Sequence, residues 1–146
     1  MAEYLLKDMI KKSEDLAIKN WEILSAGISA VKGIKVNDKV KSVMEELNID
    51  LSDHSSHNVE EIDLNQQDLI ITMSRKHSRA LVLEHPGLAD NIFTLKELNE
   101  KENNGKDIED PFGLSIEVYR ETRDEIKKNL NFLLKNLKKF ELREKD

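Results

Sequence analysis

The sequence predicts an α/β fold in which an open parallel sheet is flanked by helices. Apolar patterns typical of helices and of strands alternate along the chain with short connections, as in sheets built from crossover units. Residues 68–73 (Asp-Leu-Ile-Ile-Thr-Met) form a short apolar run of the kind that a sheet buries on both faces. The length of 146 residues fits one domain, and 38% apolar residues are enough for one core.

The chain begins with a predicted helix, and a predicted strand follows it. Apolar residues recur at three- and four-residue steps from Leu5 to Ala17, with charged residues between them. Residues 21–28 then alternate apolar and polar side chains and run into the turn Ser25-Ala26-Gly27. This alternation is typical of a strand.

A second helix is predicted over residues 36–47, where apolar positions return at helical spacing. Asn37 or Asp38 is expected to cap the start of this helix. Asn48 is expected to end it in a left-handed conformation, which asparagine tolerates better than most residues.

The rest of the chain alternates strand and helix. The apolar run of residues 68–73 is followed by a predicted helix over about 76–84, which stops at a Pro-Gly pair, and by a strand over 91–95. Residues 100–113 are polar and are predicted to form a surface loop. A long helix over about 115–142, with apolar residues on one face, closes the chain.

The composition excludes several classes of function. A net charge of −6 argues against binding to nucleic acid or to anionic membranes, because phosphate contact needs a basic stripe. No apolar run approaches the length of a membrane span, and residues 1–12 are unlike a signal peptide, so we expect a soluble, cytoplasmic protein. The chain has no cysteine, which excludes disulfides, cysteine metal sites and a catalytic thiol within it. The sequence predicts no oligomeric state.

Three loops are expected at the carboxyl ends of the predicted strands, where parallel α/β sheets place their active sites. They are Ser25-Ala26-Gly27, residues 74–77, and the loop that leads to Asp110. Asp110 precedes a proline and lies close to Phe112, an arrangement that suits a general acid beside a flat substrate group. Asp-Pro followed by glycine is also ordinary turn sequence before a helix, and residues 110–113 alone favour that interpretation.

The other polar candidates are weaker. His54 and His57 are three residues apart, as metal ligands can be, but their serine-rich surroundings predict a loop and no glutamate lies between them. We therefore predict no metal site. Residues 74–77 (Ser-Arg-Lys-His) are basic enough to attract phosphate at a helix start, although a solvated first turn explains them as well.

Four stretches, in order and with matching gaps, together resemble one known family. They are residues 1–5, 24–27, 68–77 and, most specifically, 110–125. The last stretch is similar to the acid loop and final helix of the arginine-phosphatase branch of the low-molecular-weight protein tyrosine and arginine phosphatases. The resemblance implies that Asp110 is the general acid and base, that Phe112 binds substrate, and that phosphorylated proteins are the substrates. It implies no metal and no cofactor.

The family's mechanism has two steps. A cysteine thiolate attacks phosphorus while an arginine and backbone amides hold the phosphoryl oxygens, and the aspartic acid protonates the leaving group. In the family, the cysteine and arginine lie in a Cys-x5-Arg-Ser-Pro loop just before the helix that opens this chain. That loop and the strand before it are absent here. We therefore expect residues 1–146 to be a single phosphatase-like domain, incomplete at its N-terminus and inactive as it stands. An arsenate reductase of the same fold would also need cysteines.

The missing loop has two explanations, an internal methionine taken as the start or a catalytically dead relative. The first is favoured, because the lost strand lies between two others in the family and its loss would leave their backbone groups unpaired. We expect the DNA upstream of Met1 to encode an apolar strand and Cys-x5-Arg-Ser-Pro in frame. Sequencing that DNA tests the expectation, and a stop codon or unrelated codons would contradict it.

Overall fold

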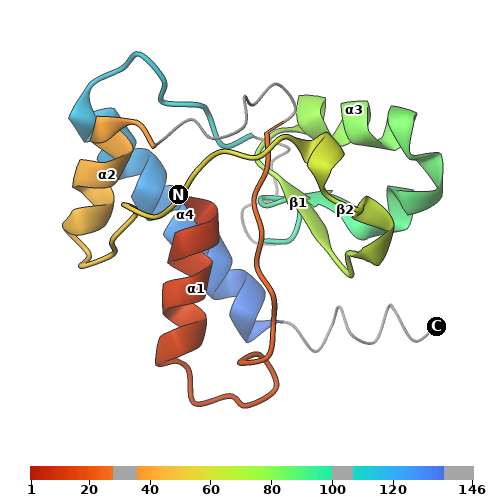
Figure 1. Ribbon diagram of the computed structural model, residues 1–146, viewed down its shortest axis with the longest axis horizontal. Coiled ribbons are helices and arrows are strands. Elements are labelled where there is room, and N and C mark those ends of the chain that lie inside the picture. The colour runs from red at the N-terminus through yellow and green to blue at the C-terminus, as the bar shows by residue number, and fades with distance from the viewer. Residues whose placement is uncertain (28–35, 100–106, 137–146) are drawn as a thin grey trace. The chain divides into compact units, whose positions relative to one another are not determined.

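The computed structural model describes residues 1–27, 36–99 and 107–136 (Figure 1). The chain divides into two compact units, each made of two separate stretches. Unit 1 comprises residues 1–67 and 110–124, and unit 2 comprises residues 68–109 and 125–146.

Unit 1 is helical. It contains α1 (Ala2–Lys12), α2 (Asp38–Glu45), the short 3₁₀ helices Val59–Glu61 and Leu64–Gln66, and the part of α4 (Ile116–Lys135) that ends at residue 124. Its buried apolar side chains are Leu5, Leu6, Ile10, Ile18, Val43, Met44, Ile49, Leu51, Leu64 and Tyr119. The predicted first and second helices are therefore confirmed in kind, with shorter bounds.

The first helix ends five residues earlier than predicted. Ser13 is extended, with φ −75° and ψ 146°, and its hydroxyl accepts a hydrogen bond from the Asp15 amide at 3.1 Å. The Asp15 carboxylate in turn accepts from the Ala17 amide at 2.9 Å. Such local side-chain bonds offer the backbone an alternative to the helix. Leu16, expected on the apolar face, is consequently 77% exposed.

The strand predicted over residues 21–28 is not present in its described part, residues 21–27. A single parallel bridge joins Gly27 to Asn58, where the Gly27 amide donates to the His57 carbonyl at 2.9 Å. Among the described residues, no backbone hydrogen bond pairs residues 22–26 with another strand. The prediction fails because alternation of side chains sets the faces of a strand but does not supply a neighbour to complete the ladder.

The ends of α2 follow the predicted signals. The Asn37 side chain accepts a hydrogen bond from the Lys39 amide at 2.8 Å and caps the helix. Beyond the other end, Asn48 has a φ of 60°, in the left-handed region. Both asparagines therefore have the roles that the sequence predicted.

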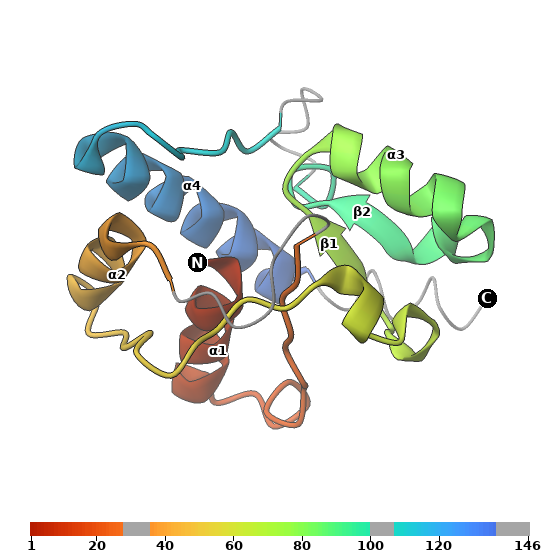
Figure 2. The ribbon, with the colours of Figure 1, turned by 45° about the horizontal axis from the view of Figure 1, so that its top comes forward.

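Unit 2 contains a parallel pair of strands and the helix between them. Strands β1 (Ile70–Thr72) and β2 (Ile92–Thr94) pair in register from Ile70 with Ile92 to Thr72 with Thr94. Helix α3 (Arg75–Glu84) packs against both strands, and the 3₁₀ helix Pro86–Asn91 leads back to β2 (Figure 2). The predicted strand–helix–strand order and the parallel sheet are confirmed. Ile70 and Ile71 are half-buried, however, not buried on both faces.

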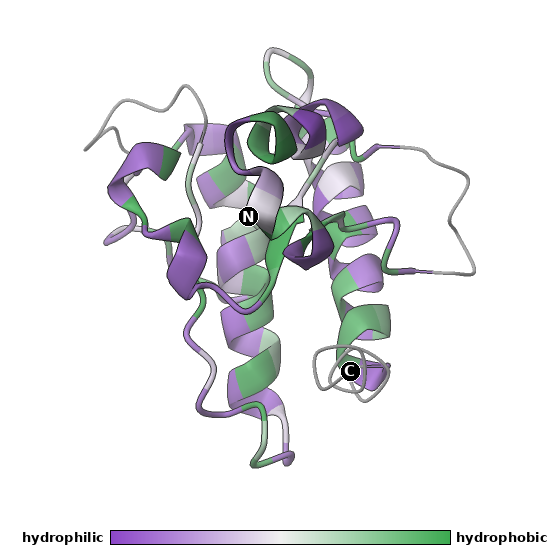
Figure 3. Ribbon diagram, turned by 90° about the vertical axis from the view of Figure 1, so that its right-hand side faces the viewer, coloured by the Kyte–Doolittle hydropathy of each residue, from purple (hydrophilic) through white to green (hydrophobic). Residues whose placement is uncertain are grey.

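The last helix, α4, begins at Ile116 and runs to Lys135. The predicted continuation beyond residue 136 and residues 100–106 of the predicted loop lie outside the described residues, while residues 107–113 contain neither helix nor strand, as predicted. The helices carry hydrophobic and hydrophilic residues on different sides (Figure 3). None of the helices in the described part of the chain is both long and apolar enough to cross a membrane.

Candidate functional site

The segment that carries the predicted general acid, residues 110–114, is a tight turn at the surface of unit 1; we name it the acid loop. The Asp110 side chain is exposed, and its Oδ1 accepts a hydrogen bond from the Phe112 amide at 3.1 Å. The Leu114 amide donates to the Pro111 carbonyl at 2.9 Å and closes the turn. Gly113 has a φ of +80°, which a residue with a Cβ rarely adopts.

The two predicted site residues, Asp110 and Phe112, are both exposed, but different contacts hold them. The Phe112 ring is 76% exposed, while Pro111 before it is buried and anchors the loop. Asp110 is fixed by its own turn and still presents its carboxylate to solvent. This placement leaves the carboxylate accessible to a molecule that approaches from solvent.

Helix α4 begins directly after the acid loop. The Ser115 hydroxyl accepts a hydrogen bond from the Val118 amide at 3.4 Å, and the Ser115 carbonyl accepts from the Tyr119 amide at 3.2 Å. Ser115 thus caps the helix, as serine commonly does at this position. The loop therefore continues into a rigid helix without a flexible linker.

Lys39 of α2 holds the C-terminal end of the acid loop. Its ammonium group donates a hydrogen bond to the Leu114 carbonyl at 2.6 Å and lies 5.8 Å from the centre of the Tyr119 ring. A hydrogen bond from a charged donor is stronger than one between neutral groups. Sequence reasoning missed this contact, since Lys39 lies 75 residues from Leu114 and no local pattern marks it.

A group of ion pairs, which we name the α2–α4 clamp, joins these two helices. Arg120 binds the Glu46 carboxylate through two nitrogens, Nε at 2.9 Å and Nη2 at 2.7 Å. Nη1 of Arg123 donates to Glu46 and to the Val43 carbonyl, at 2.7 Å each. The hydrogen bonds from Arg120 and then from Arg123 lower the pKa of Glu46 from 4.5 to about 2. The clamp fixes the start of α4, which is the helix that follows the acid loop.

The turn Ser25-Ala26-Gly27, predicted at a strand end, contacts the start of α1. The Ser25 hydroxyl donates to the Glu3 carboxylate at 2.6 Å, and Lys7 pairs with the other oxygen of Glu3 at 2.7 Å. Partial burial favours a higher pKa for Glu3, but the hydrogen bonds from Lys7 and Ser25 outweigh it and lower the pKa. Within the described residues, no hydrogen bond or ion pair joins this turn to Asp110.

Residues 74–77 form the capped first turn of α3. The Ser74 hydroxyl accepts from the His77 amide at 3.4 Å. The Asp107 carboxylate accepts from the Arg75 amide at 2.9 Å and lies 3.5 Å from Nε of Arg75. Because a carboxylate already occupies the anion position at this helix start, the turn does not need a phosphate there.

The two histidines considered as metal ligands have other partners. The His54 ring lies edge-on to Tyr4, with 5.1 Å between ring centres, and burial lowers the pKa of His54. Nδ1 of His57 lies 3.5 Å from the Glu61 carboxylate. Among residues 1–27, 36–99 and 107–136, no three histidine or acidic side chains gather as a metal site would require.

Comparison with known proteins identifies the family of this fold and acid loop. The sequence profile of the low molecular weight phosphotyrosine protein phosphatases matches residues 1–143. The chain belongs to this family. A protein-arginine-phosphatase of Bacillus subtilis strain 168 is 34% identical to it over 139 residues, which are 95% of this chain and 88% of the relative. The resemblance predicted from the sequence is thereby confirmed.

Solved structures of this phosphatase family agree with the fold. An arginine phosphatase of Geobacillus stearothermophilus superimposes with a TM-score of 0.81 at 30% identity, over 97% of this chain and 86% of that one. A low molecular weight protein tyrosine phosphatase of T. tengcongensis gives a TM-score of 0.80 at 34% identity, over 92% of this chain and 88% of the other. Both kinds of phosphatase named in the family are therefore similar to this chain.

The clamp predicts that replacing its buried arginine lowers the stability of the fold strongly. Arg123 is 6% exposed, and one of its nitrogens donates to both the Val43 carbonyl and Glu46. Arg123→Met removes this donor and leaves the buried carbonyl without a hydrogen-bond partner. We expect the free energy of unfolding to fall by about 2 kcal/mol in urea titrations. Arg79→Met changes an exposed arginine of α3 and is expected to stay within about 0.5 kcal/mol. Equal effects of the two substitutions would contradict the role of the clamp.

The lowered pKa of Glu46 predicts a pH dependence of stability. The folded pKa of about 2 lies below the ordinary 4.5, so the stability that Glu46 contributes is present above pH 4.5 and is lost as pH falls toward 2. The difference in unfolding free energy between the unsubstituted chain and Glu46→Gln should therefore shrink through that window. Urea titrations at low salt, at several pH values, measure it. A difference that stays constant from pH 6 down to about pH 2 would refute the prediction.

Proposed function

We propose that this chain supplies the general acid of a cytoplasmic protein phosphatase that hydrolyses phosphoarginine or phosphotyrosine in proteins. Asp110 protonates the leaving group and then, as a base, activates the water that releases phosphate. Phe112 lines the approach of the phosphorylated side chain. In this proposal the two units act as one phosphatase-like domain over residues 1–146. The observation that carries the proposal is an exposed carboxyl group on an anchored loop, in a chain whose residues 1–143 match the phosphatase family.

Phosphoarginine is the substrate that we favour. An aromatic ring next to the acid can stack on a planar guanidinium group as well as on a phenyl ring. Phe112 offers a largely exposed ring without a hydroxyl group. The Bacillus subtilis relative, at 34% identity, is named a protein-arginine-phosphatase, and this supports the choice.

The 146-residue chain itself is proposed to be inactive. The reaction needs a thiolate to form the covalent phosphoenzyme, and the chain contains no cysteine. The arginine that would hold the phosphoryl oxygens belongs to the same absent loop. A general acid alone lowers the barrier only for a leaving group that something else attacks.

A second candidate function is a pseudophosphatase that binds a partner without turnover. The complete lack of cysteine favours it, because no other side chain of the chain replaces a thiolate in kind. Under this reading the acid loop would serve as a docking surface. The two candidates differ in whether Asp110 accelerates a reaction once a nucleophile is supplied.

A grafted chain tests the role of Asp110. We would place an apolar strand and a Cys-x5-Arg-Ser-Pro loop directly before Met1 and measure hydrolysis of phenyl phosphate, p-nitrophenyl phosphate and phosphoarginine. We expect the graft to hydrolyse all three, and Asp110→Asn to lower kcat/KM, which reports the transfer of the phosphoryl group to cysteine, on phenyl phosphate by about 100-fold or more. The loss on p-nitrophenyl phosphate should be smaller, because nitrophenolate leaves with little need for a proton.

Two controls accompany the graft. Glu109→Gln changes the neighbouring exposed acid and is expected to leave kcat/KM unchanged. The chain without the graft is expected to show no turnover; turnover that Asp110→Asn abolishes would contradict the proposed inactivity. Equal kcat/KM values for Asp110→Asn and Glu109→Gln in an active graft would contradict the acid role.

A further inference from the structure

A lysine of α2 reaches the acid loop from a distant part of the sequence. Nζ of Lys39 donates a hydrogen bond to the Leu114 carbonyl at 2.6 Å, and the two residues are 75 positions apart. We propose that Lys39 is a positioning residue for the general acid, which acts through the acid loop without contacting the substrate. The inference rests on the function proposed for Asp110 and adds a residue on which that function depends.

Two hydrogen bonds fix the backbone on both sides of Leu114. Its amide donates to the Pro111 carbonyl at 2.9 Å, inside the loop, while its carbonyl accepts from Lys39. Because peptide groups are planar, a held N–H orients the peptide before the residue and a held C=O orients the peptide after it. The turn alone fixes only the first of these two peptides. Lys39 therefore sets the angle at which the acid loop enters α4.

Three hydrogen bonds in series connect Lys39 to the carboxylate of Asp110. The first is the bond from Lys39 to the Leu114 carbonyl, and the second runs from the Leu114 amide to the Pro111 carbonyl. The third runs from the Phe112 amide to Oδ1 of Asp110 at 3.1 Å. The Pro111 carbonyl and the Phe112 amide belong to one planar peptide group, so they rotate together. A change in the orientation of Leu114 is therefore passed on to the carboxylate.

The middle of the acid loop has little to hold it apart from these bonds. Gly113 has a φ of +80°, and apart from its chain neighbours no atom lies within 4 Å of the position that a Cβ would take. Glycine has more backbone freedom than any other residue. The Phe112 ring is 76% exposed, so side-chain packing adds little. The loop consequently depends on its two ends, the buried Pro111 and the Leu114 carbonyl that Lys39 holds.

The location of Lys39 in α2 does not serve the helix itself. It lies in the first turn, where the helix dipole disfavours a cation. Its amide donates to the Asn37 side chain at 2.8 Å, so the cap fixes the backbone from which the side chain starts. Its ammonium group also lies 5.8 Å from the centre of the ring of Tyr119, a residue of α4 that is 3% exposed. The carbonyl and the ring together account for the cation.

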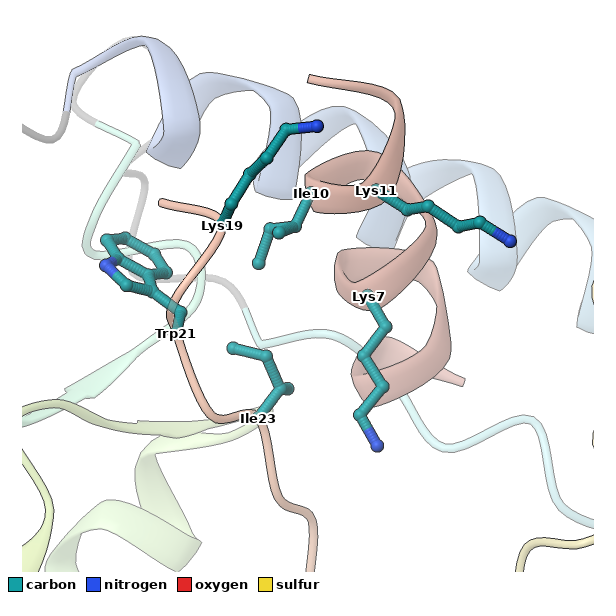
Figure 4. Close-up of a pocket in the computed structure, with 6 residues that line it drawn as sticks. All are labelled: Lys7, Ile10, Lys11, Lys19, Trp21 and Ile23. Atoms are coloured by element: carbon teal, nitrogen blue, oxygen red, sulfur yellow. The ribbon is translucent and has the colours of Figure 1, made fainter. Parts of the chain in front are cut away.

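Other lysines of unit 1 lack such partners. Lys11 and Lys19 border an open depression between α1 and residues 19–23, and their side chains extend outward (Figure 4). In the described part of the chain, neither side chain makes a hydrogen bond or an ion pair. Lys39 is exposed as well, yet its ammonium group has a carbonyl and an aromatic ring beside it.

NMR relaxation of the 146-residue chain tests the hold on the loop. We expect Lys39→Met to lower the amide order parameters of residues 112–114 from about 0.85 toward about 0.6. Lys39→Arg keeps a charged donor and should keep these values close to those of the unsubstituted chain. Lys41→Met removes another exposed lysine of α2 and should leave them unchanged. Unchanged order parameters in Lys39→Met, or equal losses in Lys39→Met and Lys41→Met, would overturn the inference.

Kinetics of the grafted chain test the link to the acid. We expect Lys39→Met to lower kcat/KM on phenyl phosphate about tenfold, and less on p-nitrophenyl phosphate, whose leaving group needs little protonation. In the Asp110→Asn background Lys39→Met should cause little further loss, since it acts through that carboxyl group. Equal losses in the two backgrounds would overturn the inference and leave the acid role standing. No loss from Asp110→Asn itself would overturn the proposed function, and the inference with it.

Discussion

The ion pairs between Glu46 and the two arginines of α4 are the constraint on which the candidate site depends. Arg123 is buried and must find acceptors, and it finds them in Glu46 and in the Val43 carbonyl of α2. This fixes the rotation of the first turns of α4 about the helix axis. The position of Ser115, and so of the acid loop before it, follows from that rotation. The start of α4 therefore depends on residues of α2, while Asp110 itself is held by its own turn.

The sequence predicted those parts of the site that depend on neighbouring residues. A turn before a helix is predicted by Asp110, Pro111 and Gly113, and the structure has that turn. The sequence predicts Asn37 or Asp38 at the start of α2 and Asn48 at its end for the same reason, since a cap is decided within three or four residues, and Asn37 is the cap that the structure has. The clamp, by contrast, joins Glu46 to Arg120 and Arg123, which lie 74 and 77 positions away in the sequence. Nothing in a charge pattern says which of many acids and arginines will meet across such a distance.

The two errors in the first unit have a common physical origin. Apolar periodicity over residues 5–17 predicted one helix, but the hydrogen bonds of Ser13 and Asp15 stopped it at Lys12. Alternation over residues 21–28 predicted a strand, but its ladder needs a neighbour that the described residues do not provide beyond the bridge of Gly27. Patterning states which face of a segment prefers burial. Whether a helix or strand forms depends on where the backbone hydrogen bonds are satisfied.

The acid loop keeps its geometry without any contribution from a thiol. The contacts that hold residues 110–115 come from the loop itself, from Lys39 of α2 and from the first turn of α4. A nucleophile acts on phosphorus, whereas the general acid acts on the leaving group, so each requires its own supports. The contacts that hold residues 110–115 therefore do not depend on a nucleophile. For this reason membership of a phosphatase family and catalysis by these 146 residues are separate questions.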